Sequence, residues 1–326
     1  MKTVPEISND HPGDPVHNKA GSFCEPRSDE RNTIFSRMEL VENSDAYNEY
    51  YSMHPERKEI DDFFREAREQ REDDIHIRRQ VDSTFDLLKD MRQFARGEAA
   101  EQQITISPSE ATAYLQQLAQ SYGAVVFGTA LLGESCFYKI RGRGNEYGKG
   151  VNIDKRQGIV FGVHMNLQQI RQAPKPEASA EVVNGYARVA LAGLALSYCI
   201  RSWGWKADCT MDGRADVILP IAARYAGLGS IGRSGLLLTK EYGPCIRLGA
   251  VLTDLPLERT KRNECNESRV CAACRKCAEA CPGKALDMNY HENGQFHPVN
   301  DNECFKKWLE FGTDCGLCIA QCPLSR

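Results

Sequence analysis

Hydrophobic residues recur along the chain with two different periods, and these periods predict where helices and strands lie. Between Pro55 and Gly97 the apolar residues follow the helical repeat on a highly charged background, which predicts two solvated amphipathic helices packed on a core. Continuous apolar runs at 123–132 and 158–166 predict buried strands. Residues 180–203 are rich in alanine and leucine and predict an apolar helix.

The segments around these elements complete the outline. Ser107 and Glu110 have the spacing of a helix capping box, so a helix is expected to begin there. The run 236–257 has a strand–turn–strand pattern. Residues 1–32 carry repeated prolines and glycines among polar residues, which predicts an extended arm without a core of its own. The mixture predicts an α/β (α+β) fold class.

Cysteine content places a boundary near Leu257, because the last sixty or so residues hold eight of the 14 cysteines and few long apolar runs. Three parts are therefore expected. Residues 1–97 form the arm and the amphipathic helices, residues 98–257 form a catalytic core, and residues 258–326 form a cysteine-rich segment.

Composition limits the classes of function. Lys and Arg number 41 against 45 Asp and Glu, and this net charge of −4 argues against a general nucleic-acid binder. The first residues of the sequence lack the basic and then apolar pattern of a leader, and the longest apolar run, Val189 to Ile200, is shorter than the roughly 20 residues of a membrane span. A cytoplasmic protein without a transmembrane segment is expected, and there cysteines serve as metal ligands or catalysts more often than as disulfides.

The spacing of the C-terminal cysteines is the strongest chemical signal in the sequence. Two runs with C-x2-C pairs each end in Cys-Pro, as in bacterial ferredoxins that hold two [4Fe–4S] clusters. In such ferredoxins the fourth cysteine of a run binds the other cluster. The predicted ligands are therefore Cys271, Cys274, Cys277 and Cys322 for one cluster, and Cys281, Cys304, Cys315 and Cys318 for the other.

Structural zinc is the alternative, but zinc sites usually use separated cysteine pairs. The six remaining cysteines have no such spacing and are expected to be free, mostly buried thiols; they are Cys24, Cys136, Cys199, Cys209, Cys245 and Cys265.

A glycine-rich stretch from Gly227 to Gly232 matches the letters G-x-G-x-x-G. It lacks the strand–turn–helix context of a dinucleotide fingerprint. We interpret it as a loop bare of side chains that lets a large cofactor approach closely. Asp74 and His76 begin an Asp-x-His pattern, but the glycine that completes a corrinoid-ligating motif is missing, and the charged helical context predicts an exposed histidine.

These features together resemble the corrinoid-dependent reductive dehalogenases. The resemblance is specific from Glu181 to Pro323, where it is carried by residues 184–207, residues 217–257 and both cysteine runs. It is weaker over 29–40 and 46–62. It implies a nitroreductase-like core that binds cobalamin and a bacterial ferredoxin-like C-terminal segment that supplies electrons from two [4Fe–4S] clusters.

The resemblance also implies candidate site residues. Tyr186 would donate a proton and Arg247, 61 residues later, would support it, with Tyr198 as the alternative donor. A third family position, often Asn, falls near Gly213, where Asp212 or Arg214 could substitute. Cobalamin would be bound base-off, and its expected contacts are Gly227, Leu228, Gly229, Ser230, Gly232, Thr239, Tyr242 and Gly243.

Several other residues could either line a functional site or serve only in core packing. Packing is the expectation for Phe137, Tyr138, Tyr147, Trp203 and Trp205, although each could line a pocket. Lys139, Arg141 and Arg143 form a basic loop that we expect to be solvated, with contact to cobalamin side groups or an anionic substrate as the alternative.

The expected activity is replacement of halogen by hydrogen on a small organohalide, with a low-potential donor such as ferredoxin or flavodoxin. Epoxyqueuosine reductases share the implied core, so reduction of a tRNA nucleoside is the second hypothesis. Their Arg-Asp-Tyr-His stretch is missing here, although basic residues of the tail could hold RNA. The third hypothesis is a simple electron carrier. The 250 or so residues that precede the cysteine-rich segment argue against it, because a carrier needs little beyond its clusters.

Overall fold

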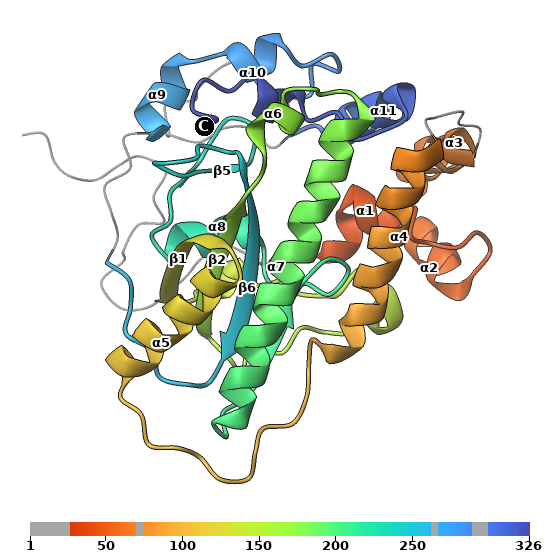
Figure 1. The fold of residues 1–326 in the computed structure, drawn as a ribbon. Coiled ribbons are helices and arrows are strands. Elements are labelled where there is room, and N and C mark those ends of the chain that lie inside the picture. Colours follow the sequence, from red (N-terminus) through yellow and green to blue (C-terminus); the bar gives the residue numbers. More distant parts are fainter. Residues whose placement is uncertain (1–26, 70–74, 262–266, 289–298) are drawn as a thin grey trace, which may run out of the picture.

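A computed structural model describes residues 27–69, 75–261, 267–288 and 299–326, which form a mixed fold of helices and strands (Figure 1). The strands are β1 (Ala124–Leu131), β2 (Gln157–His164), β3 (Ala207–Thr210), β4 (Ser230–Ile231), β5 (Leu237–Leu238) and β6 (Ile246–Thr253). The α-helices are α1 (Ile34–Met38), α2 (Asp45–Met53), α3 (Pro55–Glu69), α4 (Ile75–Met91), α5 (Pro108–Ser121), α6 (Leu167–Ile170), α7 (Pro176–Ser202), α8 (Leu219–Tyr225), α9 (Glu267–Ala273), α10 (Lys276–Glu279), α11 (Asp301–Phe311) and α12 (Leu317–Ala320). Short 3-10 turns are η1 (Glu30–Asn32), η2 (Arg92–Phe94), η3 (Glu134–Cys136) and η4 (Gly144–Glu146).

The central sheet has the order β1-β2-β6-β3, and each pairing in it is antiparallel. The predicted strands at 123–132 and 158–166 are confirmed as β1 and β2. Because the pairings are antiparallel, the fold is of the α+β kind within the predicted class. The expected strand–turn–strand at 236–257 is β5 and β6, although β5 is only two residues long and pairs with β4 instead of joining the main sheet.

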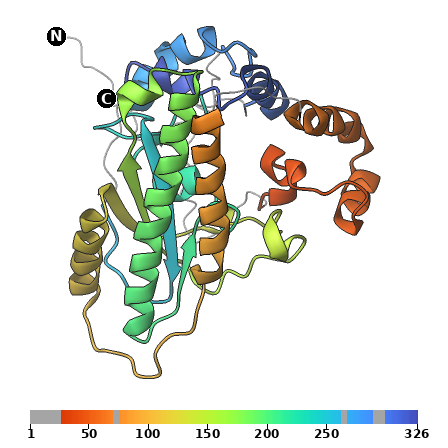
Figure 2. The same ribbon diagram turned by 45° about the vertical axis from the view of Figure 1, so that its right-hand side comes forward.

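Helices cover both faces of the sheet. Helices α5 and α7 lie on one face, and α8 lies on the other (Figure 2). Alternate residues of β2 follow this division: Ile159 and Phe161 enter the cluster under α5 and α7, whereas Val160 enters the cluster that contains Ala222 of α8. The two apolar layers explain why β2 reads as a continuous hydrophobic run.

Helix α7 is the longest described helix and forms much of the core. It begins at Pro176, a residue suited to the first turn, and α5 begins with the predicted capping box of Ser107 and Glu110. Among the described helices α7 alone is long and apolar enough to cross a bilayer. Its most apolar window is 56% buried within the fold, as a core helix would be.

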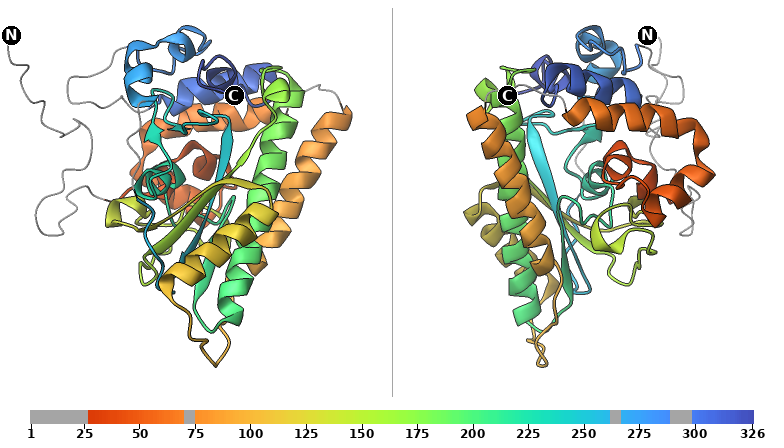
Figure 3. Two further views of the ribbon diagram at one scale, coloured as in Figure 1. Left: turned by 60° about the vertical axis from the view of Figure 1, so that its left-hand side comes forward. Right: turned by 90° about the vertical axis from the view of Figure 1, so that its right-hand side faces the viewer.

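The two amphipathic helices predicted between Pro55 and Gly97 are confirmed as α3 and α4, but they pack against different helices. Helix α4 lies along α7, while α3 lies against α11 of the cysteine-rich segment (Figure 3). Residues 1–26 of the expected arm lie outside the described residues. Arg27 donates a hydrogen bond to the carbonyl of Val151, and Gly142 N–H donates one to the buried Glu30.

The described part of the cysteine-rich segment consists of four helices, α9 to α12, which lie across one end of the core (Figures 1 and 3). Leu257 packs in the main core cluster, and Thr260 N–H still donates to the carbonyl of Thr129 in β1. Residues 257 to 260 therefore still contact the core, and the boundary near Leu257 stays a prediction.

A buried ion pair fixes the N-terminal helices to this segment. Arg37 Nε lies 3.0 Å from Asp61 Oδ2, and the two side chains are 2% and 0% exposed. The same guanidinium donates to Asp301 at 3.2 Å and to Asn302 at 2.7 Å, both in α11. A charge that is taken out of water requires such partners, so α1, α3 and α11 are held together as one unit.

Asp61→Ala should lower the free energy of unfolding by about 3 kcal/mol, because it leaves the Arg37 guanidinium buried with only the half-exposed Asp301 as an ionic partner. Urea denaturation measures the change. Lys58→Ala on the same helix is the control, since it removes an exposed pair with Asp62, and it should leave the midpoint nearly unchanged. Equal effects of the two substitutions would contradict this interpretation.

Candidate functional site

The first predicted set of cysteines comes together beside the core. Burial raises the pKa of the Cys277 thiol to about 11, and repulsion from the neighbouring thiolates of Cys271 and Cys322 adds to the rise. Burial also raises the pKa values of Cys271 and Cys322, and both thiols interact with Cys274. The two cysteine runs therefore contribute to one group of four neighbouring thiols.

The second predicted set behaves in the same way. The pKa of Cys318 is raised to about 12 by burial, and its charged neighbours include Cys304, Cys315 and Cys281. Burial raises the pKa of Cys304 to about 11, and repulsion from Cys315 and Cys281 again adds to the rise. An interaction between Cys318 and Cys277 links the two groups, which therefore lie side by side.

Across the described residues, which include all eight cysteines, no three His, Cys, Asp or Glu side chains form a group that could hold a single metal ion. The choice between iron–sulfur clusters and zinc stays a prediction.

The remaining described cysteines are free thiols with the expected burial. Cys136, Cys209 and Cys245 are buried, and burial raises their pKa values to about 12, 12 and 11, so they are protonated near neutral pH. Cys199 is half-buried, and burial raises the pKa of its thiol. Cys24 and Cys265 lie outside the described residues.

Tyr186 and Arg247 are brought into contact by the packing of α7 on β6. The guanidinium carbon of Arg247 lies 4.3 Å from the centroid of the Tyr186 ring, so the cation stacks on the face of the phenol. The helix approaches this closely because its neighbour is glycine: a Cβ at Gly185 would lie 3.1 Å from Cβ of Arg247. The predicted spacing of 61 residues therefore corresponds to a real contact.

Arg247 is held loosely by the protein. Its Nη2 lies 3.7 Å from the sulfur of Met165, and its buried Nε has no hydrogen-bond partner among the described residues. Tyr186 packs against the apolar cluster that contains Met165, and Cys318 of the second cysteine set packs against the same cluster. The tyrosine, the arginine and a cysteine set thus share one part of the molecule.

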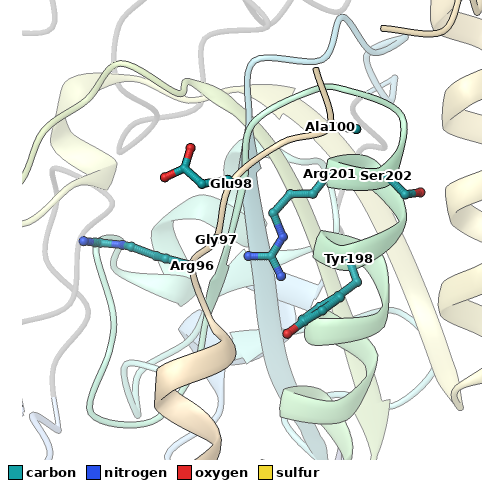
Figure 4. Close-up of a pocket in the computed structure, with 7 residues that line it drawn as sticks. All are labelled: Arg96, Gly97, Glu98, Ala100, Tyr198, Arg201 and Ser202. Atoms are coloured by element: carbon teal, nitrogen blue, oxygen red, sulfur yellow. The ribbon is translucent and has the colours of Figure 1, made fainter. Parts of the chain in front are cut away.

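Tyr198, the alternative donor, lies elsewhere. It is twelve residues further along α7, roughly 18 Å at the helical rise of 1.5 Å per residue, and is 53% exposed. Arg201 stacks on its ring at 4.3 Å, and both residues line a pocket of about 390 Å³ with Arg96 and Glu98 (Figure 4). Tyr198 is therefore separated from Arg247.

The glycine-rich stretch from Gly227 to Gly232 runs into a tight hairpin formed by β4 and β5. This agrees with the interpretation that the stretch is not a dinucleotide-binding fingerprint. A Cβ at Gly229 would collide with the carbonyl of Leu238, and one at Gly243 would collide with the carbonyl of Leu324 in the C-terminal segment. Protein neighbours therefore account for the missing side chains. Ser230 Oγ is buried there with no hydrogen-bond partner among the described residues. The cofactor contacts stay a prediction.

The third family position, Gly213, lies against an arginine. Its φ is +66°, and a Cβ at this position would collide with the guanidinium of Arg92. The residues considered as substitutes are already paired: Asp212 with Arg92 at 3.0 Å, and Arg214 with Glu146 at 3.2 Å. The chain thus fills this position with an ion-pair network.

The solvated basic loop expected around Arg141 and Arg143 is wrong for these two residues. Arg141 is 9% exposed and pairs with Asp216 at 2.7 Å, and Arg143 pairs with Asp212 at 2.9 Å. Because their acidic partners are distant in sequence, the local pattern gave no sign of these pairs. Lys139 is exposed as expected.

The aromatic residues that could have lined a pocket are packing residues, as expected. Phe137 is fully buried, Tyr138 packs on the same cluster, and Trp203 and Trp205 pack on the main core. Tyr147 packs against the tyrosines of α2. His76 is exposed on α4 as predicted, whereas Asp74 lies outside the described residues.

No known protein-family model matches the chain. Tetrachloroethene reductive dehalogenases from Sulfurospirillum multivorans and Desulfitobacterium hafniense are 33% identical over 178 residues and 31% identical over 197 residues. The chain is related to the reductive dehalogenases. The alignments take in 52% and 56% of this chain but 35% of each relative, so it spans about a third of the length of these dehalogenases.

Epoxyqueuosine reductases are also related. The enzyme from Lactococcus garvieae is 32% identical over 124 residues, which take in 36% of this chain. Both kinds of relative are oxidoreductases, in agreement with the expected class. The solved catabolic reductive dehalogenase NpRdhA superposes with a TM-score of 0.67 at 21% identity, covering 74% of this chain and 36% of that one, so the two share a fold.

Gly213→Ala should destabilise the fold by about 1–3 kcal/mol, since the added methyl group displaces Arg92. The loss should be smaller in an Arg92→Ala background, and a double-mutant cycle from urea denaturation measures that coupling. Gly148→Ala is the matched control: its φ is +79°, but nothing lies within 4 Å of the new Cβ. Additive effects of the Gly213 and Arg92 substitutions would refute the steric account.

Proposed function

We propose that the chain is a cobalamin- and iron–sulfur-dependent reductive dehalogenase that replaces a halogen by hydrogen on a small organohalide. One observation carries the proposal: Tyr186 stacks with Arg247 and packs on the same apolar cluster as Cys318. A proton donor, its cationic partner and a ligand of the electron relay would then occupy one region of the molecule. The relationship to tetrachloroethene reductive dehalogenases supports it.

The residues present fit the expected cofactors. Each cysteine set offers four thiolates to a [4Fe–4S] cluster. Two buried donors, Arg247 Nε and Ser230 Oγ, lack protein acceptors within the described part of the chain, and polar groups of a bound cobalamin or substrate would satisfy them. Cobalamin would be held base-off by the loop from Gly227 to Gly243. When bound, it supplies the reduced cobalt centre that cleaves a carbon–halogen bond.

The remaining chemistry falls to side chains of this chain. The overall change consumes the organohalide, two electrons and one proton and yields the hydrocarbon and a halide ion. Tyr186 would give its phenolic proton to the carbon that loses the halogen. The Arg247 guanidinium on the ring face would stabilise the phenolate that remains. A soluble low-potential donor such as ferredoxin or flavodoxin would reduce the two clusters again.

A second candidate is an epoxyqueuosine reductase-like activity on a tRNA nucleoside. It is supported by the epoxyqueuosine reductases among the sequence relatives and by the exposed basic residues Arg269, Arg275 and Lys276 of the cysteine-rich segment. Assays for halide release and for reduced tRNA nucleoside separate the two. A simple electron carrier is disfavoured because most described residues form a separate sheet-and-helix core.

Anaerobically reconstituted protein should contain about eight irons per chain, from two four-iron clusters. It should also bind cobalamin with an electron paramagnetic resonance spectrum of the base-off cob(II) form. Cys277→Ser should damage one cluster more than the other, whereas Cys199→Ser, a half-buried thiol outside both sets, should keep the full iron content. Zinc without labile sulfide, or nitrogen superhyperfine splitting on cobalt, would contradict these expectations.

Tyr186→Phe should keep both clusters and cobalamin but lose about 10²–10⁴-fold in turnover, because the proton donor is removed while the packing volume is nearly preserved. Arg247→Leu should cause a similar loss. Tyr198→Phe is the matched control, since that tyrosine also stacks with an arginine at 4.3 Å on the same helix.

The measurement is halide release driven by a strong artificial reductant, which bypasses the natural donor. Full turnover of Tyr186→Phe would show that this tyrosine is not the proton donor. Loss of turnover in Tyr198→Phe alone would move the assignment to the pocket at the other end of α7.

A further inference from the structure

A single buried arginine of the core holds the first cysteine loop. Arg233 follows β4 and is 1% exposed. Its guanidinium donates to three carbonyl groups of the C-terminal segment: Cys274 at 3.2 Å, Ala272 at 3.2 Å and Asp287 at 2.8 Å. Because the planar fork of an arginine fixes the direction of each bond, this side chain sets the position of the loop relative to the core.

The same residue acts directly on the sulfur atoms. The backbone N–H of Arg233 donates to Cys271 Sγ at 3.3 Å. The buried guanidinium also donates to the carbonyls of Ala272 and Cys274, so its positive charge lies within the same cysteine loop. Arg233 therefore stabilises negative charge on the set formed by Cys271, Cys274, Cys277 and Cys322.

The second set has a different environment. Two carboxylates lie close in sequence to its ligands: Asp301 is three residues before Cys304 on α11, where it pairs with Arg37 at 3.2 Å, and Asp314 directly precedes Cys315. A nearby cation makes it easier to add an electron to a cluster, and nearby carboxylates make it harder.

We propose that Arg233 is a positioning residue that raises the reduction potential of the cluster held by Cys271, Cys274, Cys277 and Cys322 above that of the other cluster. Electrons reaching either cluster then settle first on the one that touches the β4–β5 loop of the core. This inference rests on the proposed function, because it takes the two cysteine sets to hold [4Fe–4S] clusters.

The test is a redox titration of the reconstituted, full-length protein, followed by electron paramagnetic resonance with iron content measured on each sample. The parent should show two midpoint potentials. Arg233→Gln should lower the higher one by at least a tenfold change in the reduction equilibrium, about 59 mV for one electron, and leave the lower one in place. Arg233→Lys should restore most of the loss. Arg275→Gln, which removes an exposed charge next to Cys274, should shift the potential much less.

A second variant tests the same ordering without touching Arg233. Asp301→Asn removes the carboxylate three residues before Cys304 on α11, so it should raise the lower potential and narrow the gap between the clusters. This arm tests the gap between the two potentials even if Arg233→Gln does not load iron.

Three results would overturn the proposal: unchanged potentials in iron-loaded Arg233→Gln, an equal fall of both potentials, or an unchanged gap in Asp301→Asn. Failure of the proposed function is distinguishable, because parent protein without iron and labile sulfide would show no cluster potentials at all.

Discussion

The close approach of α7 to the sheet is the constraint on which the candidate site depends. A Cβ at Gly193 of the helix would lie 2.6 Å from the sulfur of Cys209, and one at Gly249 of β6 would lie 3.1 Å from Val189. Together with Gly185 these positions bring the helix backbone down onto β3 and β6. A wider separation would move the ring of Tyr186 off the guanidinium of Arg247, since both side chains start from these two elements.

Elements with a strong local signal were predicted well from the sequence. The apolar runs of β1 and β2, the capping box of α5 and the long apolar α7 each carry their pattern within a few residues. The cysteine spacing likewise predicts two sets of cluster ligands from the local geometry of short loops, and that assignment stays a prediction. The weakest prediction was the 236–257 segment, where β5 joins β4 in a small hairpin whose pairing no periodicity reveals.

The part of the site that the sequence could not predict is ionic. Asp216 pairs with Arg96 and Arg141, which lie 120 and 75 residues away, and Asp212 pairs with Arg92 and Arg143 over comparable separations. Such pairs depend on how distant loops meet, and charge patterns along the chain carry no record of them. The contacts of Arg233 with the C-terminal segment were missed for the same reason. Its only signal in the sequence is a charged residue inside a glycine-rich stretch that is otherwise apolar and small.

The ion pair between Arg37 and α11 joins residues 264 positions apart, and this has a consequence for the order in which the molecule matures. On the ribosome the N-terminal helices emerge long before α11 exists, so the contacts that hold them to it must wait until α11 has been made. Contacts of such long range close late and slowly. The same helix carries Cys304, so docking of the first helices also fixes the position of one of the predicted cluster ligands.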